Sequence, residues 1–139
     1  MRFRPVLVVI LLVPVFTLAQ IPQSKVCGSV AQYFRLNRLA PELLDVNVFE
    51  HPTEGRTMRI RIAARRSQSR RDIGLAFSAA AAVANCSEKQ FDLLWVEMVI
   101  TYKDKENSSF IAPAYCTINA LINQEITMEQ WWEDCVQVL

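Results

Sequence analysis

The first nineteen residues constrain the fold of this chain more than any other segment does. Arg2 and Arg4 precede an almost wholly apolar run over 5–18, and the run ends in Thr17-Leu18-Ala19, with small residues at the first and third of these positions. This three-part pattern is typical of a secretory signal peptide and predicts cleavage after Ala19. An uncleaved anchor is the less favoured alternative, because the run is shorter than the roughly 20 residues that span a bilayer. We therefore expect residues 20–139 to be the folded protein, secreted or periplasmic.

Export decides how the cysteines are interpreted. The chain has four of them, and an even number in an exported protein indicates disulfides. Structural zinc requires close ligand pairs, whereas these cysteines are far apart and His51 is the only histidine. We expect no metal and no cofactor. The predicted bridges use Cys27, Cys86, Cys116 and Cys135.

Length and charge limit the class of protein further. Residues 20–139 are enough for one domain with a real core. Removing 1–19 takes away two arginines and no acid, which changes the formal net charge from +1 to −1. A nucleic-acid partner is not expected, because such proteins are usually basic. No further stretch is apolar and long enough to span a membrane.

The first half of the chain alternates between helical and strand patterns. Residues 29–40 predict a helix that begins at Ser29 and ends before Pro41. The runs 43–50 and 57–64 alternate apolar and polar residues on either side of the turn-forming segment 51–55, which predicts a hairpin. Ser69 and Asp72 resemble a capping box that opens a second helix. Its predicted buried stripe is Ile73, Phe77, Ala80, Ala81 and Ala84.

The second half predicts another hairpin and a last helix. Residues 91–103 give the strongest strand pattern, 104–109 a polar turn, and 110–122 the returning strand. Pro113 places that strand at an edge or at a bulge, because proline cannot donate to the ladder. Thr127 and Gln130 have the spacing of a capping box for a helix over 127–139, with Trp131, Cys135 and Leu139 along one side.

The element order predicts an α+β domain. Helix, hairpin, helix, hairpin and helix follow one another, so we expect an antiparallel sheet of two hairpins with helices packed on one face. Because side chains alternate along a strand, the other face would carry Arg59, Arg61 and Glu97.

This layout favours one disulfide pairing of the three that four cysteines allow. Cys135 would lie about 12 Å along the last helix at 1.5 Å per residue. Cys116 would lie about 13–20 Å from the end of the returning strand at 3.3 Å per residue. The similar heights favour Cys116–Cys135, which leaves Cys27–Cys86 as the second bridge.

The candidate binding site is a concentration of arginines. Seven of the seventeen residues over 56–72 are arginine. A row of guanidinium groups that continues into a helix start is suited to phosphate, sulfate or carboxylate. The alternative is a solvated face balanced by the acidic segment 88–134. The predicted ligand-binding residues are Arg59, Arg61, Arg65, Arg70 and Arg71.

Catalytic motifs do not emerge from the sequence. His51 lies before a proline in a turn, and no phosphate-binding loop or nucleophile elbow occurs. Trp131 and Trp132 are expected to seal the edge of the core, with a binding patch as the alternative. Asn85 and Asn107 have glycosylation-acceptor patterns, which matter only in a eukaryotic source.

These patterns favour a small exported binding or accessory protein over an enzyme. Its partner would be an anionic ligand or another exported protein. The alternatives are a small secreted hydrolase that uses carboxylates, which need no histidine base, and a structural component of an envelope.

Overall fold

The computed structural model describes residues 20–101 and 105–139, so the predicted signal peptide and the tip of the second hairpin lie outside the described residues. Two short 3-10 turns, Gln23–Lys25 and Arg66–Gln68, precede the first two helices. The elements in chain order are α1 (Val26–Leu36), β1 (Glu42–His51), β2 (Gly55–Ala64), α2 (Ser69–Cys86), β3 (Leu93–Thr101), β4 (Lys105–Pro113), α3 (Ala114–Leu121), α4 (Met128–Asp134) and β5 (Gln137–Val138).

The α+β class is confirmed, but the predicted purely antiparallel sheet is wrong. The five strands follow the order β1-β2-β3-β4-β5, and β2 pairs with β3 in parallel while the other pairs are antiparallel. The cause is α2, whose 18 residues extend about 27 Å. That length carries the chain back along β2, so β3 starts at the same end and runs in the same direction.

The first hairpin forms as the alternation predicted. Val46 pairs with Ile60 and Val48 with Met58, so the apolar side chains share one face. Gly55 follows the turn with a φ of 88°, and a Cβ there would collide with the side chain of Asp92. Glycine is therefore required at the start of β2.

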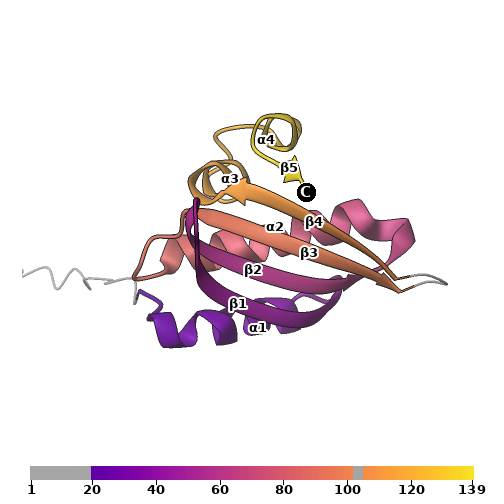
Figure 1. The fold of residues 1–139 in the computed structure, drawn as a ribbon, viewed down its shortest axis with the longest axis horizontal. Coiled ribbons are helices and arrows are strands. Elements are labelled where there is room, and N and C mark those ends of the chain that lie inside the picture. Colours follow the sequence, from indigo (N-terminus) through magenta and orange to yellow (C-terminus); the bar gives the residue numbers. More distant parts are fainter. Residues whose placement is uncertain (1–19, 102–104) are drawn as a thin grey trace, which may run out of the picture.

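The core lies between that apolar face and two helices. Figure 1 shows α1 and α2 on the same side of the sheet. The predicted stripe of α2 is buried throughout, since none of its side chains is more than 7% exposed. α1 begins at Val26 rather than Ser29, because its buried residues Val26, Val30 and Phe34 recur every four positions. The helix ends at Leu36, where the Asn37 side chain accepts a hydrogen bond from the Leu39 amide (3.1 Å).

The predicted strand over 110–122 is wrong beyond Pro113. β4 instead begins at Lys105 and ends at Pro113, and residues 114–121 form α3. The buried residues Ala114, Thr117 and Ala120 recur every three positions, and the Thr117 hydroxyl donates to the Pro113 carbonyl (2.9 Å). Asn107, placed in a turn by the sequence, pairs with Val99 in the ladder.

The capping box at Thr127 is confirmed in both of its hydrogen bonds. The helix that it opens is shorter than predicted, because α4 ends at Asp134 and the chain returns to the sheet as β5. β5 pairs with β4. Trp131 is the only residue of α4 that is buried, and its ring meets Phe77 of α2 edge to face at 5.2 Å.

One of the two predicted disulfides is present. Cys116 and Cys135 are bonded, with 6.5 Å between their Cα atoms, although Cys116 lies on α3 rather than on a strand. The predicted Cys27–Cys86 bridge is not formed, and both thiols are free and exposed. The Cys27 thiol instead lies 3.6 Å from the Val46 carbonyl of β1, and Cys86 is the last residue of α2.

Candidate functional site

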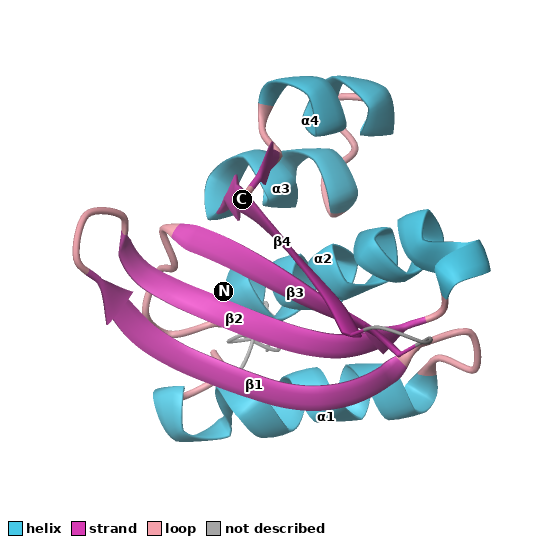
Figure 2. Cartoon of the chain, turned by 45° about the vertical axis from the view of Figure 1, so that its right-hand side comes forward, coloured by secondary structure: helices cyan, strands magenta, loops and turns pink. Residues whose placement is uncertain are grey.

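The fold separates the five predicted arginines. Arg59 and Arg61 lie on β2, on the face of the sheet opposite α1 and α2, which carries no helix in the described part of the chain (Figure 2). Arg65 follows β2, and Arg70 and Arg71 lie in the first turn of α2. The predicted continuous row is therefore wrong beyond Arg61, since the 3-10 turn over 66–68 changes the direction of the chain.

We define the open sheet face by the residues that alternate with the core-facing ones. Cross-strand pairing aligns most of them in two rows, one through Arg59 and Trp95 and one through Arg61 and Glu97, while Phe49 lies in a third row opposite Thr57. In strand order the members used below are Asp45, Asn47, Phe49, Arg59, Arg61, Trp95, Glu97, Ser109 and Ile111.

Arg59 sits between two aromatic rings on this face. Its guanidinium carbon is 5.6 Å from the ring centroid of Phe49 and 5.7 Å from that of Trp95. The two rings lie edge to face, with centroids 6.1 Å apart. Cation–π attraction to two rings limits the freedom of the guanidinium. It forms no ion pair with any described residue.

Arg61 is arranged differently. Its Nε lies 3.5 Å from Oε1 of Glu97 on the neighbouring strand, and the arginine side chain is 44% exposed. An exposed pair of this kind contributes about 0–1 kcal/mol to stability. Its guanidinium is partly neutralised, so Arg61 is less available to an anion than Arg59.

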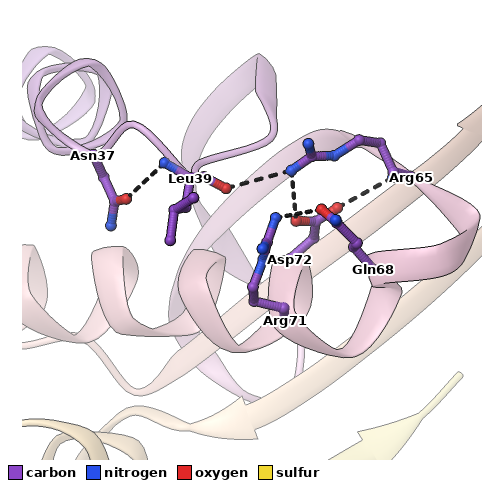
Figure 3. Close-up of polar contacts among 6 residues, drawn as sticks. All are labelled: Asn37, Leu39, Arg65, Gln68, Arg71 and Asp72. Atoms are coloured by element: carbon purple, nitrogen blue, oxygen red, sulfur yellow. Dashed lines mark hydrogen bonds and ion pairs between the residues drawn. The ribbon is translucent and has the colours of Figure 1, made fainter.

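Arg65 contacts Leu39 and Asp72 instead of contributing to the open sheet face (Figure 3). Its guanidinium donates to the Leu39 carbonyl (3.4 Å) and lies 3.6 Å from Oδ1 of Asp72. Asp72 is fully buried, and its other oxygen accepts the backbone N–H of Arg65 (3.1 Å). The predicted capping box from Ser69 is not formed, since Gln68 precedes the helix and makes no side-chain cap. Asp72 instead ties the helix start to the end of β2.

The two arginines of the first turn of α2 also diverge. Arg71 donates to the side chain of Gln68, as Figure 3 shows. Arg70 lines a pocket of about 310 Å³ that α2 forms with α4. Neither residue lies on the open sheet face.

Two aromatic residues of the site were not identified from the sequence. Phe49 was treated only as part of a strand, although its alternation with Val46 and Val48 places it on the solvent face. Trp95 lies in the predicted strand over 91–103, and its alternation with Val96 places it on the same face as Arg59. Its indole N–H is buried and finds no acceptor among the described residues.

The side chains of His51 and Cys27 both contact backbone groups of the chain. Nδ1 of His51 accepts the backbone N–H groups of Thr53 and Glu54, both at 3.2 Å, so the ring stabilises its own turn. Burial raises the pKa of the Cys27 thiol above its ordinary value, and the negative charge of Asp45 raises it further. A raised pKa keeps the thiol protonated and therefore a poor nucleophile.

None of the described helices is long and apolar enough to cross a membrane. Comparisons with protein-family models, with curated proteins and with solved structures found no match to this chain.

Proposed function

We propose that this protein is a small exported binding module that docks an acidic segment of a partner protein on its open sheet face. Export is supported by the signal-peptide pattern over 1–19 and by the Cys116–Cys135 disulfide, a bond typical of oxidising compartments. A nucleic-acid partner is not part of the proposal, because the chain without 1–19 has a formal net charge of −1.

The observation that carries the proposal is the position of Arg59 between Phe49 and Trp95. Arginine and tryptophan are among the residues that contribute most to binding energy at protein interfaces. Here the rings hold the guanidinium in place before a partner arrives, which lowers the entropy lost on binding. They also supply apolar area around it.

The charge on this face explains why the partner segment would be acidic. Arg61 is engaged by Glu97, and Arg65 is engaged by Asp72 away from the face. Arg59 is left with donors that are not used in an ion pair. A carboxylate can accept two parallel hydrogen bonds from one guanidinium, which adds directional specificity to the attraction.

The hydrolase interpretation has less support. The carboxylate of Glu97 on the open sheet face is held by Arg61. A glycosidase-type site needs two carboxylates that flank the bond to be cleaved. The described part of this face offers Asp45 as the second acid, and Asp45 is aligned with Arg61 on its other side.

The test uses an oligoglutamate peptide as probe and the three indole N–H signals of the tryptophans in a ¹⁵N-labelled protein. We expect the Trp95 signal to shift on titration, while the Trp131 signal stays in place because its N–H donates to Thr117 in the core (3.0 Å). Arg59→Gln should weaken binding by about ten- to a hundredfold, since a hydrogen bond to a charged group contributes about 1.5–3 kcal/mol.

The matched control is Arg38→Gln, which removes the same charge from an exposed position in the turn between α1 and β1. It should leave the affinity almost unchanged. Equal weakening in both variants would show that the peptide responds to overall charge and would contradict a site at Arg59. A Trp95 signal that does not move would contradict it as well.

A further inference from the structure

A pocket of about 310 Å³ lies on the helix side of the sheet, between the first turns of α2 and the helix α4. The ring of Trp131 on α4 packs against Phe77 of α2, which places the pocket away from the open sheet face. The pocket volume is at the lower end of the range for small-molecule sites. The pocket is lined by Arg70, Gly74, Met128, Glu129, Trp131, Trp132 and Glu133.

The apolar part of the wall is held rigidly. Trp131 is 1% exposed and is fixed by its hydrogen bond to Thr117. The half-buried ring of Trp132 lies 6.1 Å from it and 5.8 Å from the ring of Phe110. These packed rings give a preformed apolar surface, so a ligand would not have to order it.

The charged part of the wall is divided between the two helices. Arg70 projects from α2, while Glu129 and Glu133 are one turn apart on α4. Two like charges at this spacing destabilise a helix by about 0.2–0.5 kcal/mol. Arg70 lies in the first turn of its own helix, where the helix dipole disfavours a cation. Even so, none of the three forms an ion pair with another described residue.

We propose that this pocket binds a free α-amino acid with an apolar side chain. The carboxylate of the ligand would lie at Arg70 and its ammonium group at Glu129 and Glu133. Its side chain would pack on Trp132 and Met128. Such a zwitterion matches the opposed charges of the pocket and offsets the repulsion between the two glutamates, which neither a simple anion nor an apolar molecule would do. This site is separate from the open sheet face and does not depend on the function proposed there.

The experiment is calorimetric titration of the folded protein with phenylalanine, leucine and methionine at millimolar concentration. Two analogues of phenylalanine test the charge assignment, since phenethylamine lacks the carboxylate and 3-phenylpropanoate lacks the ammonium. We expect at least one amino acid to bind saturably, and each analogue to bind about tenfold more weakly or worse than phenylalanine.

Exposed charges of the wall can be changed without disturbing the core. Arg70→Gln should weaken amino-acid binding about tenfold and leave phenethylamine binding unchanged. The double variant Glu129→Gln/Glu133→Gln should weaken amino-acid binding and leave 3-phenylpropanoate binding unchanged. The matched controls are Arg71→Gln and Asp134→Asn, which alter the adjacent charges outside the pocket and should bind as the parent protein does.

Gly74→Leu provides a test that does not involve charge. A Cβ at Gly74 would lie 3.9 Å from the Met128 side chain, an ordinary van der Waals distance, so α2 can accept a side chain there. The leucine atoms beyond Cβ would then fill the pocket. We expect binding to be lost while the folded state is kept. No saturable binding of any of the three amino acids, or equal binding by Arg70→Gln and Arg71→Gln, would overturn the proposal. Arg59→Gln should not affect this site, so the two proposals fail independently.

Discussion

At the scale of single residues, Asp72 shows how one buried carboxylate can organise a junction between elements. It has no exposed surface, and it accepts the Arg65 backbone N–H while its second oxygen faces the Arg65 guanidinium. The same guanidinium reaches the Leu39 carbonyl and so joins the segment after α1 to the start of α2. Arg65 therefore makes structural contacts with both the segment after α1 and the start of α2.

We expect Asp72→Ala to lower the free energy of unfolding by about 1–3 kcal/mol, because it leaves the Arg65 N–H without an acceptor. Asp72→Asn should cost less, since its amide oxygen can still accept that hydrogen bond. Urea unfolding followed by circular dichroism measures both changes. The exposed Asp134→Ala serves as control and should stay within about 0.5 kcal/mol of the parent. If Asp72→Ala were as stable as this control, the described role of Asp72 would be wrong.

At the scale of elements, the C-terminal part is attached to the sheet by several independent contacts. The capping box starts α4, Trp131 anchors it against Phe77, and β5 pairs with β4. The disulfide joins α3 to the residue that follows α4, across a sequence separation of 19. The pocket between α2 and α4 depends on these contacts, because α4 itself has only seven residues.

We expect Cys116→Ala/Cys135→Ala to lower the free energy of unfolding by about 3 kcal/mol, because the bridge closes a loop in the unfolded chain across its sequence separation of 19. The measurement is urea unfolding under non-reducing conditions, with Cys86→Ala as the control for loss of an exposed thiol. A thiol assay on the parent protein, unfolded without a reducing agent, should count two free thiols, Cys27 and Cys86. A count of four would show that the bridge is absent from the native protein.

At the scale of the whole molecule, the two faces of the sheet have different surroundings. One is filled by α1 and α2 and makes the core, while the other presents Arg59, Phe49 and Trp95 without a described helix over it. The proposed interface therefore needs no rearrangement of the core.

The export part of the proposal predicts a defined N terminus. Expression of the full chain in a secreting host should release a protein that begins at Gln20, which intact-mass spectrometry of the medium or periplasm would detect. Replacing Leu11 and Leu12 by arginine interrupts the apolar run and should keep the protein inside the cell. Released protein that retains Met1, or release of the doubly substituted chain, would contradict cleavage after Ala19.

Much of the fold follows from local patterns. The alternation over 57–64 correctly placed Met58, Ile60 and Ile62 in the core, and the spacing of Ile73 and Phe77 correctly predicted the buried side of α2. The capping box at Thr127 was also predicted, as it depends on residues only three positions apart. These features are local because a strand or helix period determines which side chains share a face.

The segment 114–121 shows where a local pattern is ambiguous. Ala114, Cys116 and Ala120 fit a strand that alternates, yet Ala114, Thr117 and Ala120 fit a helix equally well. Short apolar runs do not distinguish the two periods. The segment is helical because Pro113 ends the strand ladder and because α3 packs on α2.

The sequence by itself determined the α+β class, the first hairpin and the core side of α2. It favoured the Cys116–Cys135 pairing, which is present, although Cys116 lies on α3 and not on the strand from which the pairing was argued. Only the tertiary structure decided that β2 and β3 run in parallel, that Cys27 and Cys86 are not bonded, and that the arginines divide between two sides of the molecule. The physical reason is that periodicity specifies which way a side chain faces relative to its own backbone. The neighbours of that side chain depend on the path of the chain through the 3-10 turn and α2, which brings together residues far apart in the sequence.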